Sequence, residues 1–171
     1  MERGGLLYAP NKEKPYTGSV FDLYENGTEK LNGRYRKGIK NGKWTYWNSN
    51  GQKRNETTYK DGKKIRIIEW EYYENGQKRN AITYKEGQYD GKLINWYENG
   101  QKKQESTYKD GKPEKKWTEW YDNGQKQVEA TFKDDKRDRL WTWWYQNGQK
   151  RQEATYKDGE IVGVWTSWNE K

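Results

Sequence analysis

The side chains able to carry out acid–base chemistry in this 171-residue chain are carboxylates, tyrosines and lysines, because the sequence contains no histidine and no cysteine. Enzymes working near neutral pH commonly use a histidine base or an activated thiol or hydroxyl. No motif that would supply a base surrounds the serines, which are Ser19, Ser49, Ser106 and Ser167. We therefore expect no catalytic residue, no enzymatic activity and no cofactor.

Carboxylates recur in two columns, and paired carboxylates can hydrolyse glycosides. The columns are Glu56, Glu105, Glu129 and Glu153, and then Asp61, Glu86, Asp110 and Asp158. The first column falls opposite threonines and beside lysines, which favours solvated cross-strand partners over catalysis. The second belongs to turns, and its lysine flanks and low acidic density are unlike those of a calcium-binding repeat. We expect no metal site.

The composition is polar, yet it predicts a folded chain. Lysine and arginine number 34 against 26 acidic residues, a net charge of +8, and 29% of residues are hydrophobic. Disordered chains are poor in aromatic residues, whereas this one has 11 tryptophans and 15 tyrosines. The sequence therefore predicts an aromatic core. Without cysteine, it provides no disulfide framework and does not indicate a redox compartment.

Two turn signals alternate along the chain with a period of 24 residues and one interval of 25. The first kind begins at Asn26 and continues as Asn50-Gly51, Asn75-Gly76, Asn99-Gly100, Asn123-Gly124 and Asn147-Gly148. The second kind contains Gly38, Gly62, Gly87, Gly111, Asp135 and Gly159. Asn-Gly and Asp-Gly between aromatic runs predict two-residue type I′ hairpin turns, with positive φ at both residues. The extra residue, between Gly62 and Asn75, predicts a β-bulge.

These signals predict an all-β fold: a single-layer antiparallel meander of about six repeated 24-residue β-hairpins, forming an elongated, twisted repeat sheet. Residues 1–16 would be a lead-in segment and residues 17–171 the repeat domain. A closed barrel and a propeller are the alternatives, although a propeller blade needs about 40 residues.

Strand alternation assigns the aromatic residues to two faces, if the numbers of residues opposite each other across the Asn99-Gly100 turn sum to 199. One face would pack, with small residues Ala81, Ser106, Ala130 and Ala154 set against large ones. The large residues of this face are Trp44, Leu93, Trp117, Trp141, Trp165, Tyr73, Tyr97, Tyr121, Tyr145, Tyr35, Tyr59, Tyr84, Tyr108, Phe132 and Tyr156.

The other face is the candidate binding face, because it carries a second aromatic ladder with no evident cover. Its aromatic residues are Trp47, Tyr72, Trp96, Trp120, Trp144 and Trp168. The same register places basic residues opposite four of them, Arg54, Arg79, Lys103 and Arg151, and predicts cation–π stacking within each hairpin. A structural ladder sealed by these basic side chains is the alternative to a groove for an extended ligand.

The phrase Gly-x-Trp-x-x-Trp-Tyr-x-Asn-Gly-Gln-Lys, followed by Glu-x-x-Tyr-Lys-Asp-Gly, resembles the MORN-repeat variant of many bacterial proteins, some labelled the YwqK family of antitoxins. The resemblance covers about residues 17–168 and implies repeated hairpins in an elongated sheet. Departures at Gly27-Thr28-Glu29 and Asp134-Asp135, together with the inserted residue, suggest that the first repeat is a cap and the third a bend.

The sequence thus predicts a non-catalytic scaffold that binds a partner protein, antitoxin-like or envelope-associated, by its aromatic trough or by strand addition. The alternative is a polymer: glycan on the Trp ladder, or anionic lipid or nucleic acid on lysine columns such as Lys53, Lys78, Lys102, Lys126 and Lys150. Self-association through the open sheet ends and a repeat with no ligand also remain open. The chain reads as soluble, with an exported or lipid-anchored parent left open.

Overall fold

The computed structural model describes residues 1–170 and divides into two compact units, Met1–Trp70 and Glu71–Lys171. All regular elements in the described residues are β-strands. None of residues 1–170 belongs to a helix long and apolar enough to cross a membrane.

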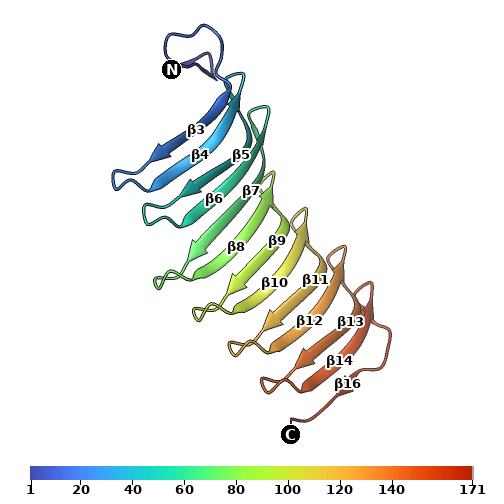
Figure 1. Ribbon diagram of the computed structural model, residues 1–171. Helices are drawn as coiled ribbons and strands as arrows, with labels where there is room; N and C mark the ends of the chain where they lie inside the picture. The colour runs from blue at the N-terminus through green and yellow to red at the C-terminus, as the bar shows by residue number, and fades with distance from the viewer. Residues whose placement is uncertain (171) are drawn as a thin grey trace. The chain divides into compact units, whose positions relative to one another are not determined.

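The first unit contains β1 (Glu2–Arg3), β2 (Leu6–Leu7), β3 (Gly18–Leu23), β4 (Glu29–Arg36), β5 (Ile39–Trp47), β6 (Lys53–Lys60) and most of β7 (Lys63–Tyr72). Strands β3 to β7 pair antiparallel in chain order (Figure 1). The lead-in strands β1 and β2 form a small sheet of their own. Leu7 N–H donates to the Gly38 carbonyl at 2.8 Å, so this segment lies against the turn between β4 and β5.

The second unit contains β8 (Lys78–Lys85), β9 (Gln88–Trp96), β10 (Lys102–Lys109), β11 (Lys112–Trp120), β12 (Lys126–Lys133), β13 (Lys136–Trp144), β14 (Lys150–Lys157), β15 (Glu160–Ile161) and β16 (Thr166–Ser167). Strands β8 to β14 again pair antiparallel in chain order (Figure 1), and β15 and β16 both pair with β14. The predicted all-β meander of repeated hairpins is confirmed in each unit.

The second kind of turn has the predicted type I′ conformation. Asp110 and Gly111 both have positive φ, 48° and 80°. The pair Asp134-Asp135 adopts the same conformation, with φ of 51° and 65°, although it lacks the glycine. Aspartate tolerates the left-handed region better than most residues, so the hairpin is retained there at some cost in strain.

The prediction of a type I′ conformation at the first kind of turn was wrong. At Asn99-Gly100, Tyr97 N–H donates to the Gln101 carbonyl at 2.8 Å, which encloses three residues, and Gly100 alone of them has positive φ, 84°. Asn99 Oδ1 accepts from Gln101 N–H at 3.0 Å, so the side chain supports a turn in which asparagine keeps an ordinary φ. This is a three-residue loop with glycine at the bulge.

Successive hairpins of a unit are joined at the first turns by side-chain hydrogen bonds. Asn99 Nδ2 donates to the Asp122 carbonyl at 2.7 Å, and Tyr97 Oη donates to the Trp120 carbonyl at 2.8 Å. The tyrosine contact recurs at Tyr24, Tyr73, Tyr121 and Tyr145. Where both are present, as at Asn75, Asn99 and Asn123, the asparagine and the tyrosine therefore hold one first turn against the next.

The core is one face of the sheet, as the aromatic content predicts. In the first unit Trp44 and Tyr59 are buried, and in the second the buried cluster is Ala130, Trp141, Ala154 and Tyr156. Rings of the second unit follow one another at centroid distances of 5.0–6.2 Å, in the order Tyr89, Tyr108, Trp117, Phe132 and Trp141. A single hairpin could not bury such rings, and adjacent hairpins do.

Two details of this packing face differ from expectation. Ala81 pairs with Ile94, and Ile82 pairs with Leu93, so Ile82 occupies the packing column and Ala81 lies on the other face. The inserted residue gives a register shift of one in β7, leaving Ile65 without a partner on β6. Strands β5, β9, β11 and β13 have a bulge at the equivalent position, where their pairing with the preceding strand shifts by two residues. The insertion therefore alters an existing bulge and does not create one.

Candidate functional site

The face opposite the core is built by simple alternation along each long strand. In β11, Trp117 faces the core, while Thr118 and Trp120 point to the other side. Thr118 is buried, whereas Trp120 is half-buried. We call this surface the Trp–Lys face of each unit. In the first unit it carries Trp47 and Trp70 with Lys53, and in the second it carries Trp96, Trp120, Trp144 and Trp168 with Lys78, Lys102, Lys126 and Lys150.

The predicted cross-hairpin partners of these tryptophans are wrong by one residue. Trp96 is opposite Lys102, not Lys103, because the register shifts between Lys102 and Gln104 and leaves Lys103 as a bulge. The same correction applies to two further pairs: Trp47 is opposite Lys53 rather than Arg54, and Trp144 is opposite Lys150 rather than Arg151. The pairing of Tyr72 with Arg79 stays a prediction.

The displaced basic residues contact tyrosines instead. Lys103 Nζ lies 5.5 Å from the Tyr97 ring centroid, and the Arg151 guanidinium lies 5.9 Å from that of Tyr145. The bulge thus separates two neighbouring cations, one on the Trp–Lys face and one beside the turn tyrosine.

Each lysine of the Trp–Lys face covers the tryptophan of the following hairpin rather than that of its own. Lys102 Nζ lies 5.8 Å from the Trp120 ring centroid, and Lys126 Nζ lies 5.6 Å from that of Trp144. The equivalent ring beneath Lys53 is Trp70, at 5.8 Å, a residue that the predicted ladder did not include. These distances are near the outer limit for cation–π attraction, so the rings are partly covered and not sealed.

Glutamates connect these lysines to a second lysine on the neighbouring strand. Glu105 accepts hydrogen bonds at 2.6 Å from both Lys102 and Lys92. The bond from Lys102, followed by that from Lys92, holds the pKa of Glu105 below its usual value despite partial burial. One carboxylate with two ammonium groups leaves about one net positive charge in this part of the repeat.

The next repeat reproduces this arrangement. Glu129 pairs with Lys126 at 2.6 Å and with Lys116 at 3.0 Å. Its pKa is also lowered, chiefly by the hydrogen bond from Lys126. The motif therefore presents the same group of charges at intervals of 24 residues.

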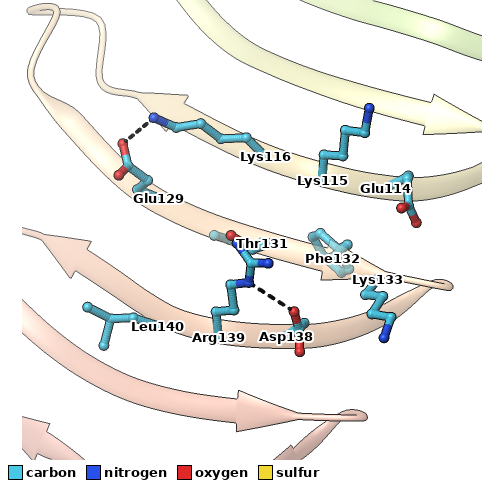
Figure 2. Close-up of a pocket in the computed structure, with 11 residues that line it drawn as sticks. Glu114, Lys115, Lys116, Glu129, Thr131, Phe132, Lys133, Asp138, Arg139 and Leu140 are labelled. Atoms are coloured by element: carbon cyan, nitrogen blue, oxygen red, sulfur yellow. Dashed lines mark ion pairs between the residues drawn. The ribbon is translucent and has the colours of Figure 1, made fainter.

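Three hollows lie along this face in the second unit: one of about 600 Å³ beside Lys150 and Trp168, and two among the charges around Glu105 and Glu129. The larger of these two, about 550 Å³, is shown in Figure 2, where Lys116 pairs with Glu129, and Arg139 pairs with Asp138 while it extends toward Thr131. The smaller, about 380 Å³, is lined by Lys92, Glu105, Thr107, Lys115, Lys116, Thr118 and Trp120. Both combine cations, one or more carboxylates and apolar surface, a lining suited to binding polar polymers or protein segments.

This surface presents aromatic rings and ammonium groups. In residues 1–170 no group of three or more carboxylates is placed to hold a metal ion. Tryptophan rings can stack on planar or apolar groups, and lysines can contact anions. The predictions from sequence missed Trp70, the lysine partners of the rings and the packing residue Trp143. Trp143 could have been found, since it is two residues beyond Trp141 on the same strand and alternation places both on the packing face.

The repeated geometry agrees with a family pattern, the MORN repeat variant, which matches residues 40–61, 69–86, 89–110, 113–134 and 140–158. The chain belongs to this family. All five matches begin before a turn of the first kind and end near the next turn of the second kind. One MORN repeat variant therefore corresponds to one hairpin. Family membership makes the chain a repeat scaffold, as the resemblance in its sequence indicates.

Other comparisons add little about this MORN repeat protein. No curated protein sequence matches it significantly. Among solved structures, it is similar to the crystal structure of a protein of unknown function from Bacteroides fragilis NCTC 9343, with 11% identity over 89% of this chain and 93% of that chain. The TM-score is 0.18, so this similarity carries no argument.

Proposed function

We propose that the protein is a non-catalytic binding scaffold that holds a partner protein against its Trp–Lys face. The observation that carries this proposal is the repetition of one half-buried tryptophan, one covering lysine and one lysine-bound glutamate, hairpin after hairpin. Trp120 beneath Lys102 and Trp144 beneath Lys126 show it in successive hairpins of the second unit, where Glu105 and Glu129 bind these two lysines.

The partial burial of these rings supports a binding role. A partner's apolar groups would displace water from the exposed part of each ring, and the lysine stems would pack alongside. Tryptophan and tyrosine are enriched at the centres of protein interfaces because they bury large areas at small entropic cost. An identical set of side chains at each repeat would engage an extended segment more readily than a compact one.

The biological form of this binding is a further part of the proposal. The partner would be a toxin held in an inactive complex, or a protein of the cell envelope. Strand addition to an open sheet edge is a second way to hold such a segment, because main-chain hydrogen bonds are available there.

Polymer binding is the alternative, favoured by the excess of lysine over glutamate around Glu105 and Glu129. A glycan would stack on the tryptophans, whereas an anionic lipid or nucleic acid would contact the lysines. Salt separates these ligands: polyanion affinity falls steeply with salt, and binding through tryptophan responds weakly.

The test is a pull-down from lysate of the source cell at about 50 mM and about 300 mM salt. The bait is the full chain, and Trp96→Ala/Trp120→Ala/Trp144→Ala is the variant that removes the ladder. A captured protein is then purified, and its Kd is measured for both baits. We expect one partner to bind at both salt concentrations and to lose at least about tenfold in affinity for the variant.

The matched control is Lys85→Gln/Lys109→Gln/Lys157→Gln, which changes three exposed lysines next to the second turns and outside the two hollows. Circular dichroism of both variants checks that the sheet is retained. Equal loss of affinity in control and ladder variant would reject the Trp–Lys face as the site. Recovery of nucleic acid or lipid alone, released by salt, would reject the protein partner in favour of a polyanion.

A further inference from the structure

Two bulge residues in the second unit break the pattern of the repeat. Gly42 and Gly91 occupy the bulge position in β5 and β9, with φ of 72° and 116°. The equivalent residues in β11 and β13 are Lys115 and Arg139, which keep positive φ values of 65° and 63°. A long side chain in the left-handed region costs about 1 kcal/mol relative to glycine. Strain of this kind in two successive repeats points to a use for the side chains.

The bulges direct both cations onto the Trp–Lys face. In the backbone pairing of the strands, Lys115 is opposite Phe132 and Arg139 is opposite Tyr156. Phe132 and Tyr156 belong to the packing face. The side chains nevertheless line the two hollows: Lys115 lies with Glu105 and Thr107 in the smaller one, and Arg139 is drawn extending toward Thr131 in the larger one (Figure 2). Re-aiming of a side chain is a known consequence of a bulge.

The two cations retain capacity for a ligand. Within residues 1–170 Lys115 makes no ion pair, although Lys116 beside it is held by Glu129. Arg139 pairs with Asp138 through Nε at 3.5 Å, and its side chain is 80% exposed. The remaining guanidinium nitrogens are directed away from that pair and can bind a carboxylate in a bidentate manner.

The two hollows share part of their lining, although the larger also contains Lys115 and has no counterpart of Trp120. Lys92, Glu105 and Thr107 surround Lys115, and the residues 24 positions later, Lys116, Glu129 and Thr131, surround Arg139. Strand β11 and strand β13 are separated by one strand, so equivalent atoms are about 10 Å apart at a spacing of about 4.8 Å per strand. A ligand that uses both sites must carry two anionic groups at about this distance.

We propose that these two sites bind an acidic, extended segment of a partner protein, with one carboxylate at Lys115 and a second at Arg139. This inference rests on the proposed function and specifies the chemistry of the partner. A polyproline II segment has three residues per turn and rises about 3.1 Å per residue, so acidic side chains at i and i+3 lie about 9 Å apart on one side. Such a segment matches the repeat of the sheet.

The lining of the hollows favours a peptide over a dense polyanion. Each hollow contains a glutamate, Glu105 or Glu129, which would repel a continuous row of phosphates. Each also offers apolar surface: Trp120 in the smaller hollow and Leu140, 51% exposed, in the larger. Discrete carboxylates separated by proline rings would satisfy both features, since proline-rich segments bind aromatic-lined grooves.

The probe is a labelled peptide of repeated Glu-Pro-Pro triplets, so that a glutamate recurs at every third residue. A Glu-Pro peptide of equal charge, with glutamates at i and i+2, tests the spacing, and a single-stranded oligonucleotide of equal charge tests a polyanion. Binding to the full chain is followed by fluorescence anisotropy at about 150 mM salt. We expect the triplet peptide to bind at least about fivefold more tightly than either competitor.

The decisive variant is Lys115→Gly/Arg139→Gly, because glycine occupies the same bulge in β5 and β9 and will preserve the fold. The matched control is Lys112→Gln/Lys136→Gln, which removes the same charge from the same two strands outside the hollows. We expect at least about a tenfold loss of affinity for the triplet peptide in the first variant and less than about a twofold change in the second.

Equal losses in the two variants would overturn the inference, because general charge would then account for binding. Tighter binding of the oligonucleotide that disappears with Lys115→Gly/Arg139→Gly would also overturn it and assign the sites to nucleic acid. Absence of peptide binding by the unmodified chain would overturn the inference alone. The pull-down with the tryptophan variant tests the scaffold itself, so the two failures are distinguishable.

Discussion

Strand β13 carries two tryptophans three residues apart that lie in opposite environments. Trp141 is buried among Phe132 and Tyr156 at ring distances of 5.0 and 5.5 Å, and its Nε1 donates to the Thr131 carbonyl. Trp144 is half-buried beneath Lys126, on the Trp–Lys face. The same residue type thus closes the core on one face and leaves contact surface on the other. Stability thus depends on one side of a single layer, and the binding that we propose would use the other.

Alanine substitution of the two residues should separate these roles. Trp141→Ala removes a buried ring together with its hydrogen bond, so we expect it to lower the free energy of unfolding by about 3–5 kcal/mol. Trp144→Ala removes a ring with one face in water and should cost about 1 kcal/mol. Urea denaturation followed by far-ultraviolet circular dichroism measures both. Equal losses of stability would contradict the assignment of the faces.

A tyrosine hydroxyl group links neighbouring hairpins at the first turns. Tyr121 Oη donates to the carbonyl of Trp144 at 2.9 Å, so it ties one hairpin to the Trp–Lys face of the next. Tyr121→Phe should lower the free energy of unfolding by about 1 kcal/mol, since it leaves the ring in place and removes one hydrogen bond.

The comparison for this variant is Tyr89→Phe, at a tyrosine 38% exposed whose hydroxyl makes no hydrogen bond among residues 1–170. Urea denaturation should show almost no effect there. If both variants lose the same stability, the hydroxyl at position 121 does not join the hairpins.

The periodicity of the sequence was sufficient to predict the hairpins and most of the packing face. Two predicted members differ: Ala81 lies on the other face, and Trp165 is 50% exposed. A column of large aromatic residues against small ones can form only if strands alternate and neighbours stack, and the buried pair Trp141 and Ala154 is such a contact. The second turns were also predictable, because Asp110-Gly111 needs positive φ at both residues. These features depend on residue type and period alone.

The register near the first turns could not be obtained in this way. Asn99-Gly100 is compatible with a two-residue turn and with a three-residue loop, and the choice depends on hydrogen bonds from Asn99 to Gln101 and Asp122. The bulge at Lys103 then places Lys102, and not Lys103, opposite Trp96. Local pairing was therefore predicted correctly at Leu93 and Ser106 and incorrectly at Trp96.

The two bulge cations were partly visible in the sequence. The repeat begins Gly-x-Trp, and Lys115 and Arg139 replace that glycine in the fourth and fifth long strands. Nothing in the sequence shows that they keep the backbone conformation of glycine, because lysine and arginine seldom adopt positive φ. The replacement of glycine can be seen in the sequence, but the position of the two side chains on the Trp–Lys face could be found only from the structure.

The smallest expected effect is a pH dependence confined to the Trp–Lys face. The pKa of Glu129 is lowered from 4.5, first by the hydrogen bond from Lys126. A carboxyl group with a lower pKa in the folded state stabilises the fold above its unfolded pKa, and this contribution is lost as pH falls through the folded value. Because the side chain of Glu129 is 34% exposed, the contribution should be a few tenths of a kcal/mol, about that of a surface ion pair.

Glu129→Gln measures this contribution against the core. The difference in unfolding free energy between the unmodified chain and Glu129→Gln should be present at pH 6 and should shrink as pH falls from about 5 to about 3. The cost of Trp141→Ala should stay constant over the same range, since Trp141 contacts no carboxylate in the described residues. If the cost of Trp141→Ala instead falls in parallel with that of Glu129→Gln, titration on one face reaches the packing of the other. The two faces would then be a single coupled layer, and binding on the Trp–Lys face would be expected to stabilise the core.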